Sequence, residues 1–479
     1  MCKDAFDRRT ILTATTALSM AGMLPHRARA QNGKAAPGTR GMVSLPRRGE
    51  FVIRGAHILS MDDQIGDLPN ADVYVRAGTI VAVATNVSAP DAQLIEGEGM
   101  ICMPGLVETH WHHWTSALRP LMRQDDPDRT YFPVTFKCGL QYTPDDSYRS
   151  VRLGIAQALA AGITTTQNWA HNVRSPAHAD AEMSAMRDTG IRGRFAYGSP
   201  LGEPNDKPMD LADLVRVKRD WVDKEGMLTL GICSRNVDGS IGGTRGAIDV
   251  DMVKKEWGAA RDLGLPITLH TTGGSAIKIL NDAGLLGPDL QLVHPLGSSV
   301  EDRAALAKHG VSYSTSPVGE AGRAGDIQFA EMLQDGIRMS MSIDHTTTHS
   351  CDFFMNMRIL HTLNLHRMGE RFKLPMRRLV RLATIDGARD LGLADKIGSL
   401  TPGKRADLIL IRTTDDNLSP IGDPYDALVQ LAQPVNIDTV VVDGRILRRK
   451  NQFVALDHEE VIRHAMESVA DLKSRAKLS

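Results

Sequence analysis

Two histidines, His110 and His112, stand two positions apart at the end of an apolar run that covers residues 100–107. In a β-strand, residues i and i+2 point to the same face of the sheet, so both imidazole rings can reach one metal ion from one strand. Neutral imidazole is a common ligand for zinc and for other borderline divalent ions. The spacing therefore predicts one half of a metal site at the end of this strand.

Three further candidate ligands, His270, His294 and Asp344, each follow directly on an apolar run with strand character. The carboxyl end of a strand is where a β/α barrel keeps its active site. A metal ion with neutral ligands lowers the pKa of its water from about 15.7 toward about 7, and a carboxylate beside it can accept the proton. A single buried histidine is usually structural, but ligand types at several strand ends favour a metal site for hydrolysis.

The elements that must position these residues alternate along the middle of the chain. Strand patterns occur at residues 101–110, 163–171, 192–198, 227–235, 266–270, 290–294, 311–315 and 337–344. Each is followed by a stretch long enough for a helix, and repeated strand–helix units predict a parallel sheet that closes into a barrel. We therefore expect an α/β protein with a (β/α)8 barrel of the TIM type across residues 101–395.

Short alternating strand patterns lie on both sides of the predicted barrel, in residues 48–100 and 396–456. Turn signals separate the patterns, which is typical of a small β-layer and not of helices. Half-sheets at both ends predict one composite β-sandwich domain assembled from the two chain ends. The pattern of residues 457–479 predicts an amphipathic helix that packs on the body of the protein or on another subunit. A homo-oligomer is therefore one of the alternatives.

Residues 1–30 have the features of a targeting segment. Arg8 and Arg9 form a twin-arginine pattern, a mildly apolar stretch follows, and residues 28–30 form a small-x-small cleavage site. This predicts a signal peptide for the twin-arginine export machinery and a periplasmic or secreted protein, with residues 31–47 as a linker. A disordered basic tail is the alternative.

The composition excludes several classes of partner. Hydrophobic residues make up 42% of the chain, charged residues make up 24%, and the formal net charge is -1. There is no basic run or nucleic-acid-binding motif, and no apolar stretch is long enough for an internal membrane span. The five cysteines show no CxxC spacing, so a disulfide framework is not expected, and a single disulfide is the alternative. A small molecule is the expected substrate.

Taken together, these residues resemble the amidohydrolase superfamily, in particular its cytosine-deaminase and triazine-hydrolase-like branch. The motif pieces are residues 104–112, 162–166, 292–294, 343–344, 383–388 and 398–409. Each piece alone is weak, but their order and their positions at strand ends are specific, and they cover nearly the whole chain after the leader.

The resemblance implies a metal-dependent hydrolase in which the ligands of one divalent ion are His110, His112, His270 and Asp344. It also implies catalytic roles for Asp344, which takes the proton of the water, and for His294, which hydrogen-bonds the attacking water or the substrate oxygen. Three histidines and a carboxylate suit zinc first, and iron, cobalt or manganese as alternatives.

Two departures from the family pattern narrow the expected chemistry. Two-metal members carry a lysine, usually carbamylated, near the end of the fourth strand, whereas residues 227–235 contain none, so we expect one ion. Deaminases of this branch carry a glutamate three residues after the fifth-strand histidine, whereas Gly273 stands there in this chain. The first hypothesis is therefore hydrolysis of a non-peptide C–N bond, in an amide, cyclic amide or carbamate, by metal-activated water.

The alternative hypothesis is a deaminase of a heterocyclic substrate that uses Glu320 as its proton shuttle, and a non-catalytic metal-binding barrel ranks below both. Candidate substrate-binding residues near the strand ends are His171, Glu320, His345 and Trp111, although core packing or loop polarity would also explain each of them. Residues 114–142 form either a lid or substrate wall, or a structural insertion.

Overall fold

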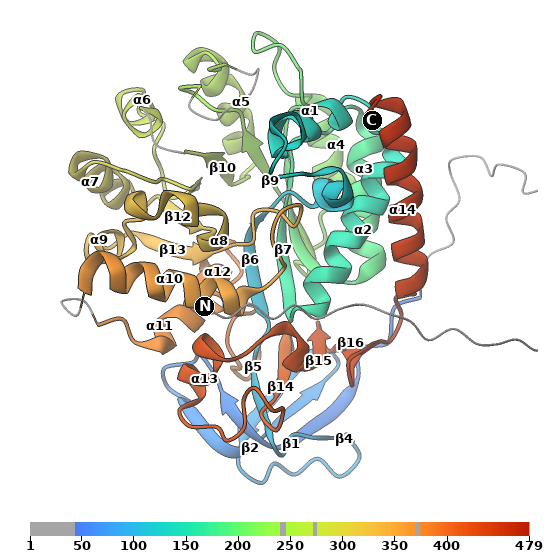
Figure 1. The fold of residues 1–479 in the computed structure, drawn as a ribbon. Helices are drawn as coiled ribbons and strands as arrows, with labels where there is room; N and C mark the ends of the chain where they lie inside the picture. The colour runs from blue at the N-terminus through green and yellow to red at the C-terminus, as the bar shows by residue number, and fades with distance from the viewer. Residues whose placement is uncertain (1–43, 240–245, 272–274, 370–372, 479) are drawn as a thin grey trace, which may run out of the picture. The chain divides into compact units, whose positions relative to one another are not determined.

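The computed structural model describes residues 44–239, 246–271, 275–369 and 373–478 (Figure 1). The predicted signal peptide and most of the predicted linker lie outside these residues. Within the described part of the chain, no helix combines the length and the apolar character that a membrane crossing needs.

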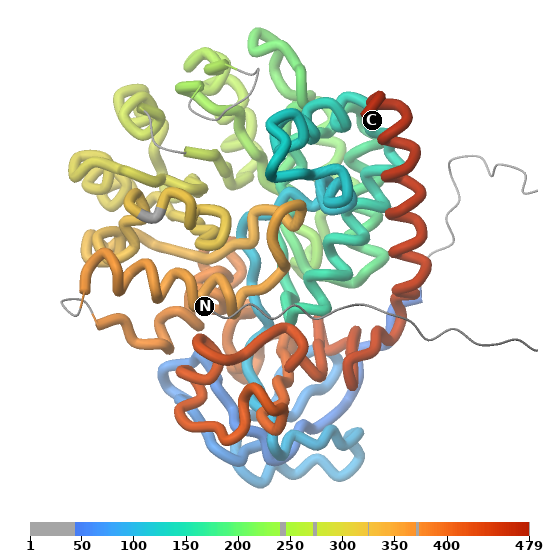
Figure 2. Tube along the Cα trace, in the orientation of Figure 1, coloured from blue at the N-terminus to red at the C-terminus, as the bar shows by residue number. Residues whose placement is uncertain are grey.

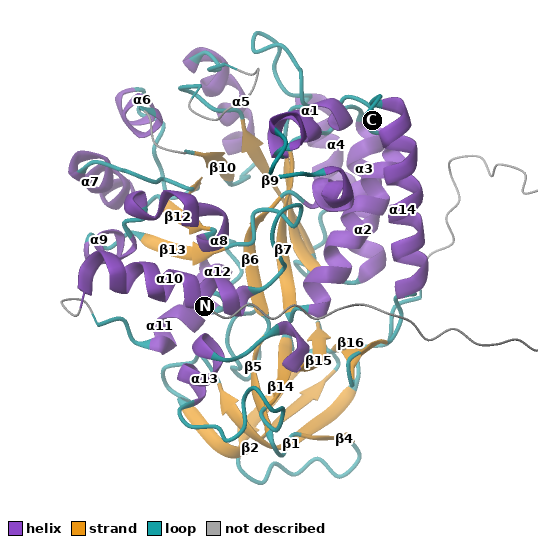
Figure 3. Ribbon diagram, in the orientation of Figure 1, coloured by secondary structure: helices purple, strands orange, loops and turns teal. Residues whose placement is uncertain are grey.

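Eight parallel strands form the barrel sheet and follow one another in chain order (Figure 3). They are β6 (Leu106–Trp111), β7 (Ile163–Ala170), β8 (Arg192–Tyr197), β9 (Leu228–Ser234), β10 (Ile267–His270), β11 (Leu290–Val293), β12 (Ser312–Thr315) and β13 (Arg338–Met341). A parallel bridge between Trp111 and Asp344 joins the last strand region to the first. The predicted TIM-type barrel is thereby confirmed.

The helices of the barrel lie between its strands. They are α2 (Pro144–Ala160), α3 (Pro176–Thr189), α4 (Leu211–Trp221), α5 (Val250–Asp262), α6 (Ala276–Asp282), α7 (Val300–His309), α9 (Phe329–Gln334), α10 (Phe353–Met368), α11 (Met376–Leu382) and α12 (Ile385–Asp390). Shorter turns of helix follow β6 and β12, namely η1 (His113–Leu121), η2 (Pro127–Arg129), α1 (Tyr131–Gly139), α8 (Pro317–Glu320) and η3 (Ala321–Asp326). Helix α2 shows why such a segment starts where it does, because Thr143 and Asp146 form a reciprocal capping box in front of it.

The predicted strand 101–110 is two strands that belong to different sheets. Strand β5 (Met100–Pro104) belongs to the first sheet, and β6 opens the barrel directly after Gly105. A side chain at Gly105 would put its Cβ 2.1 Å from Thr164 Oγ1, so only glycine lets the chain pass from one sheet to the other at this point.

The first sheet has nine strands and takes them from both ends of the chain. Besides β5, they are β1 (Glu50–Leu59), β2 (Asp67–Arg76), β3 (Thr79–Ala84), β4 (Gln93–Glu96), β14 (Leu408–Arg412), β15 (Ile437–Val442), β16 (Arg445–Arg449) and β17 (Gln452–Phe453). The antiparallel pair β5–β14 joins the two halves, so blue and red segments of the chain lie together in Figure 2. Two short elements, α13 (Pro424–Gln430) and η5 (Pro434–Asn436), connect β14 to β15.

The last helix, α14 (His458–Arg475), packs on the barrel. Its Val461 and Ala465 share an apolar cluster with Leu153 of α2 and Ala117 of η1, and Arg152 forms an ion pair with Glu460 at 2.8 Å. One face of the amphipathic helix is therefore covered by this chain itself.

A buried ion pair links the barrel to the composite sheet. Arg192, at the start of β8, is fully buried and donates from Nε and Nη2 to the two carboxylate oxygens of Asp407, at 2.6 and 3.0 Å. Asp407 lies directly before β14 and also accepts a hydrogen bond from the backbone N–H of Asp443 at 2.8 Å. Two planar groups held by two parallel hydrogen bonds fix the orientation of one sheet against the other.

We expect Asp407→Asn to lower the free energy of unfolding by about 3 kcal/mol, because the buried guanidinium of Arg192 loses its nearest counter-charge and keeps the more distant Asp443 carboxylate, at 3.6 Å. Urea unfolding followed by circular dichroism measures the change. Asp220→Asn is the matched control, since the ion pair of Asp220 with Arg219 is exposed and screened by solvent, so its loss should leave the free energy of unfolding nearly unchanged. Equal effects of the two substitutions would contradict a special role for the buried pair.

Candidate metal centre

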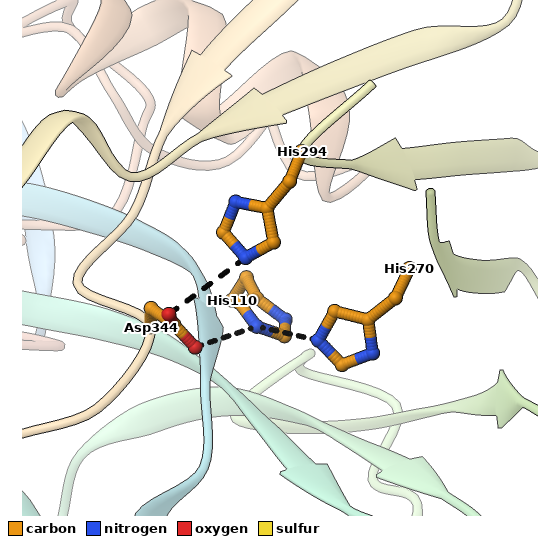
Figure 4. A group of neighbouring side chains, drawn as sticks. All are labelled: His110, His270, His294 and Asp344. Atoms are coloured by element: carbon orange, nitrogen blue, oxygen red, sulfur yellow. Dashed lines mark hydrogen bonds and ion pairs between the residues drawn. The ribbon is translucent and has the colours of Figure 1, made fainter. Parts of the chain in front are cut away.

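Four histidines and one aspartate meet at the carboxyl end of the barrel strands. Single ligand atoms of His110, His270, His294 and Asp344 all lie within 4.8 Å of one another (Figure 4). His112 belongs to the same group, because its Nε2 lies 3.3 Å from Asp344 Oδ1. The structure thus brings together every residue predicted as a metal ligand, together with the predicted catalytic His294.

The backbone bonds that close the barrel run between the ligand segments themselves. The N–H of His112 donates to the carbonyl oxygen of Asp344 at 2.7 Å, and the N–H of Asp344 donates to the carbonyl oxygen of His110 at 2.9 Å. These two bonds, called the seam below, complete the sheet and also set the positions of Asp344 and of the histidine pair.

A β-bulge in β6 explains how His110 reaches the centre. The pairing of β6 with β7 shifts register between Glu108 and Trp111. Thr109 also faces the barrel interior, where its Oγ1 lies 2.9 Å from both Ser314 Oγ and Ser340 Oγ. Two consecutive residues on one side of a strand are the signature of a bulge, which often re-aims a side chain beside an active site.

The bulge is held by Glu108, which the sequence analysis did not single out. Its carboxylate accepts hydrogen bonds from the N–H of His110 at 2.6 Å and from Thr166 Oγ1 at 2.7 Å. Burial raises the pKa of Glu108 to about 8, although these hydrogen bonds oppose the shift. A carboxylate inside an apolar strand, two residues before the first ligand, was the signal that could have identified it.

Two of the site residues adopt strained backbone conformations. His294 has φ +57° and Asp344 has φ +67°, in the left-handed region that residues with a side chain rarely enter. Such strain persists where the surrounding structure holds it, and it concentrates at functional sites. His294 directly follows β11 and Asp344 lies three residues after the end of β13, so the turn of the backbone aims each side chain at the centre.

Burial keeps three histidines of the centre neutral. It lowers the pKa of His110 to about 3, and it also lowers the pKa of His112 and of His270. Burial alone would raise the pKa of Asp344, but the neighbouring His345 and the contacts with the rings of His110 and His112 outweigh it and hold that pKa well below its usual value. Neutral imidazoles around a carboxylate are the donor set that zinc and similar divalent ions take.

The contact between His110 and His270 fits a shared cation. Their Nε2 atoms lie 3.2 Å apart, and neither ring is expected to carry a second proton. Two lone pairs at this separation repel each other unless a proton or a metal ion lies between them. These residues therefore fit a divalent ion.

His171 orients the ring of His112 through a contact at the Nδ1 atom of that ring. Its Nδ1 lies 3.1 Å from His112 Nδ1 and accepts a hydrogen bond from Trp114 Nε1 at 3.2 Å. Because an indole N–H can only donate, His171 Nδ1 is an acceptor, and the Nδ1 of His112 then carries its proton. That tautomer leaves the Nε2 lone pair of His112 for the centre, an arrangement typical of metal-binding histidines. His171 also lines the cavity above the centre.

Glu320 has a different position from the one a proton shuttle needs. It accepts hydrogen bonds from His294 Nδ1 at 2.6 Å, Thr315 Oγ1 at 2.7 Å and the N–H of Ser316 at 2.8 Å. Burial lowers the pKa of His294, but the bond to Glu320 and the charge of Asp344 outweigh it and raise that pKa overall. Glu320 therefore positions His294, and the hypothesis that it contacts the substrate as a shuttle is not supported.

Trp111 does not line the cavity within the described part of the chain. It is fully buried, and its ring stacks on that of His113 with centroids 4.2 Å apart. Since His110 and His112 point inward, the residue between them points to the outer face of the strand, which explains the error. Trp169 is the tryptophan that borders the cavity, with its ring centroid 4.2 Å from that of His270.

The centre opens into a cavity of about 670 Å³, a size suited to a small organic molecule. His345 lies at its edge, next to Asp344, and its ring stacks on Tyr131 with centroids 4.4 Å apart. The segment that the sequence left open as wall or insertion therefore supplies part of the cavity through α1.

A sequence model described as the amidohydrolase family matches residues 101–447. Among curated relatives, a 5′-deoxyadenosine deaminase of Methanosarcina mazei is 24% identical over 457 residues, which cover 89% of this chain and 99% of that protein.

Two solved structures with bound zinc share the fold. An adenosine deaminase from Xanthomonas campestris has a TM-score of 0.77 at 20% identity, and the match covers 90% of this chain and 100% of that one. An atrazine chlorohydrolase from Arthrobacter aurescens has a TM-score of 0.74 at 21% identity, and the match covers 88% of this chain and 100% of that one.

We expect His270→Ala to weaken zinc binding at least about 100-fold, because it removes a neutral donor from the middle of the centre. Competition with a chromophoric chelator measures the dissociation constant, and elemental analysis of the loaded protein should give about one zinc per chain. His458→Ala, at the exposed start of α14, is the control and should bind zinc like the unsubstituted protein. Unchanged affinity in His270→Ala would remove His270 from the ligand set.

Proposed function

The chain belongs to the amidohydrolase family, and from that membership we propose that it hydrolyses a non-peptide C–N bond of a small molecule with the help of one divalent ion, zinc in the first place. The observation that carries the proposal is the convergence of three neutral histidines, a fourth histidine and the Asp344 carboxylate on one point at the barrel mouth. Hydrolysis of C–N bonds is also the chemistry named for its curated relative.

The residues divide the work by their positions. His110, His112, His270 and Asp344 would hold the ion, which supplies a Lewis acid and makes a water molecule more acidic. Asp344 accepts the proton of the attacking water and delivers it to the leaving nitrogen. His294, held by Glu320, donates a hydrogen bond to the developing oxyanion, a contact of the kind that contributes about 3 kcal/mol.

The small number of carboxyl groups among the described cavity residues favours an amide, a cyclic amide or a carbamate as the substrate. Of the described residues that line the cavity, only Glu320 and Asp344 carry a carboxyl group, and Glu320 is fully engaged behind His294. Residues 271–274 carry no acid in the sequence. A carbonyl substrate needs one carboxylate, because the same group can serve the water and then the leaving nitrogen.

Deamination of a heterocycle is the second candidate, and the relative named 5′-deoxyadenosine deaminase favours it. That reaction also protonates a ring nitrogen, so Asp344 would have to serve two sites on the substrate. Glu320, the other acid among the described residues that line the cavity, is already bonded to His294, Thr315 and Ser316.

The two candidates release different products. The zinc-loaded protein is offered dihydrouracil, a set of secondary amides and carbamates, and 5′-deoxyadenosine, with a coupled ammonia assay and with chromatography of the products. We expect new carboxylic acid from dihydrouracil and the amides, free amine, alcohol and carbon dioxide from the carbamates, and no ammonia from the nucleoside. If 5′-deoxyadenosine is the only compound that is hydrolysed, and it releases ammonia, the second candidate replaces the first.

Asp344→Asn should reduce turnover about 100- to 10,000-fold with little change in thermal unfolding, because the amide cannot accept the proton of the water. Asp282→Asn, an exposed position on α6, is the control. Full activity in Asp344→Asn would show that another group is the base.

We also propose that residues 1–30 direct export, on the strength of the twin-arginine pattern and the cleavage site. Sequencing of the amino terminus of protein recovered from the periplasm tests this. A mature chain that begins at Gln31 is expected, and an unprocessed cytoplasmic chain would contradict it.

A further inference from the structure

One wall of the cavity is apolar and comes from helix α1. Phe132 and Phe136 stand one helical turn apart, so they share a face of the helix, and both line the cavity. Leu201, from the loop after β8, lines it as well. These three side chains are called the apolar wall below.

The apolar wall is held by close backbone packing. A Cβ at Gly139 would lie 2.5 Å from Leu201 Cδ1, and a Cβ at Gly202 would lie 3.1 Å from Leu140 Cδ2. Gly202 also has φ +78°, a conformation that favours glycine. The loop after β8 therefore lies directly against α1, and the wall is formed before any substrate arrives.

Aromatic surface continues from the apolar wall to the reacting centre. Tyr131, the first residue of α1, stacks on His345 with an interplanar angle of 24°, and His345 Nε2 lies 3.8 Å from Asp344 Oδ2. Trp169, which also borders the cavity, lies against His270. A flat group attached to the scissile bond would thus meet ring faces along its length.

One cationic group that lines the cavity already has its partners within the protein. Arg235 lines the cavity, but its guanidinium is held by Glu256 at 2.6 Å and by the carbonyl oxygens of Pro204 and Lys207. Phe132, in contrast, is 50% exposed and gains contact area when an apolar group covers it.

We propose that the apolar wall selects substrates whose non-reacting part is a flat aromatic group, so that the C–N bond cleaved belongs to an aryl-bearing amide, cyclic amide or carbamate. This inference rests on the proposed function for the reacting end of the substrate. The apolar wall then contributes binding energy remote from the reaction, which orients the scissile bond at the metal centre.

Binding of two metal-chelating probes tests the apolar wall without turnover. The zinc-loaded protein is titrated with acetohydroxamate and with 2-naphthohydroxamate by calorimetry, and we expect the naphthyl probe to bind about 30-fold more tightly. Phe132→Ser and Phe136→Ser should each lower that preference about five- to tenfold and leave acetohydroxamate binding unchanged. Leu365→Ser, at an exposed position of α10 that does not line the cavity, should keep the full preference.

The same titrations with 2-naphthol separate the two proposals, because this probe needs no metal ion. One possible result is that neither hydroxamate binds, whereas 2-naphthol still binds through Phe132 and Phe136. This result would contradict the proposed metal-dependent function and support the apolar wall. Equal binding of the two hydroxamates, or a naphthyl preference that survives both serine variants, would overturn the apolar wall.

Discussion

The barrel closes through backbone hydrogen bonds that run between His110, His112 and Asp344. This is the constraint on which the site depends, because a sheet with this seam open would leave the carboxylate and the histidine pair free to move apart. The hydrogen bonds that close the barrel therefore also bring the carboxylate and the histidine pair together. It also explains why the aspartate can sit in a left-handed conformation, since a hydrogen bond on each side of it holds the backbone there.

Several buried polar groups maintain the geometry that closure begins. Glu108 holds the bulge under His110, His171 fixes the proton of His112, and Glu320 does the same for His294. Each acts through a hydrogen bond to a residue of the centre and not through contact with a ligand. A ring with only one nitrogen fixed in this way presents the other in a defined state, which is how proteins prepare histidines for metal ions and for catalysis.

Chemistry and selectivity come from different parts of the chain. The donor atoms lie at the ends of strands whose positions the whole barrel determines, whereas the aromatic surface comes from α1 and from the loop after β8. Segments between barrel elements can change without disturbing the seam, because they make few of its hydrogen bonds. The buried Arg192–Asp407 pair keeps the composite sheet attached at the opposite side of the same framework.

The sequence by itself determined the barrel, the two halves of the composite sheet and the candidate ligands that meet at the mouth of the barrel. These follow from local rules, since apolar periodicity reveals strands and i, i+2 spacing puts His110 and His112 on one face. Only the tertiary structure decided what depends on distant contacts. The break at Gly105 comes from the approach of Thr164, the engagement of Glu320 comes from His294, and the role of His171 needs Trp114 beside it. Such pairs join residues from separate elements, so their contacts exist only after the strands have met. Trp111 differs, because strand alternation alone already points it away from the cavity.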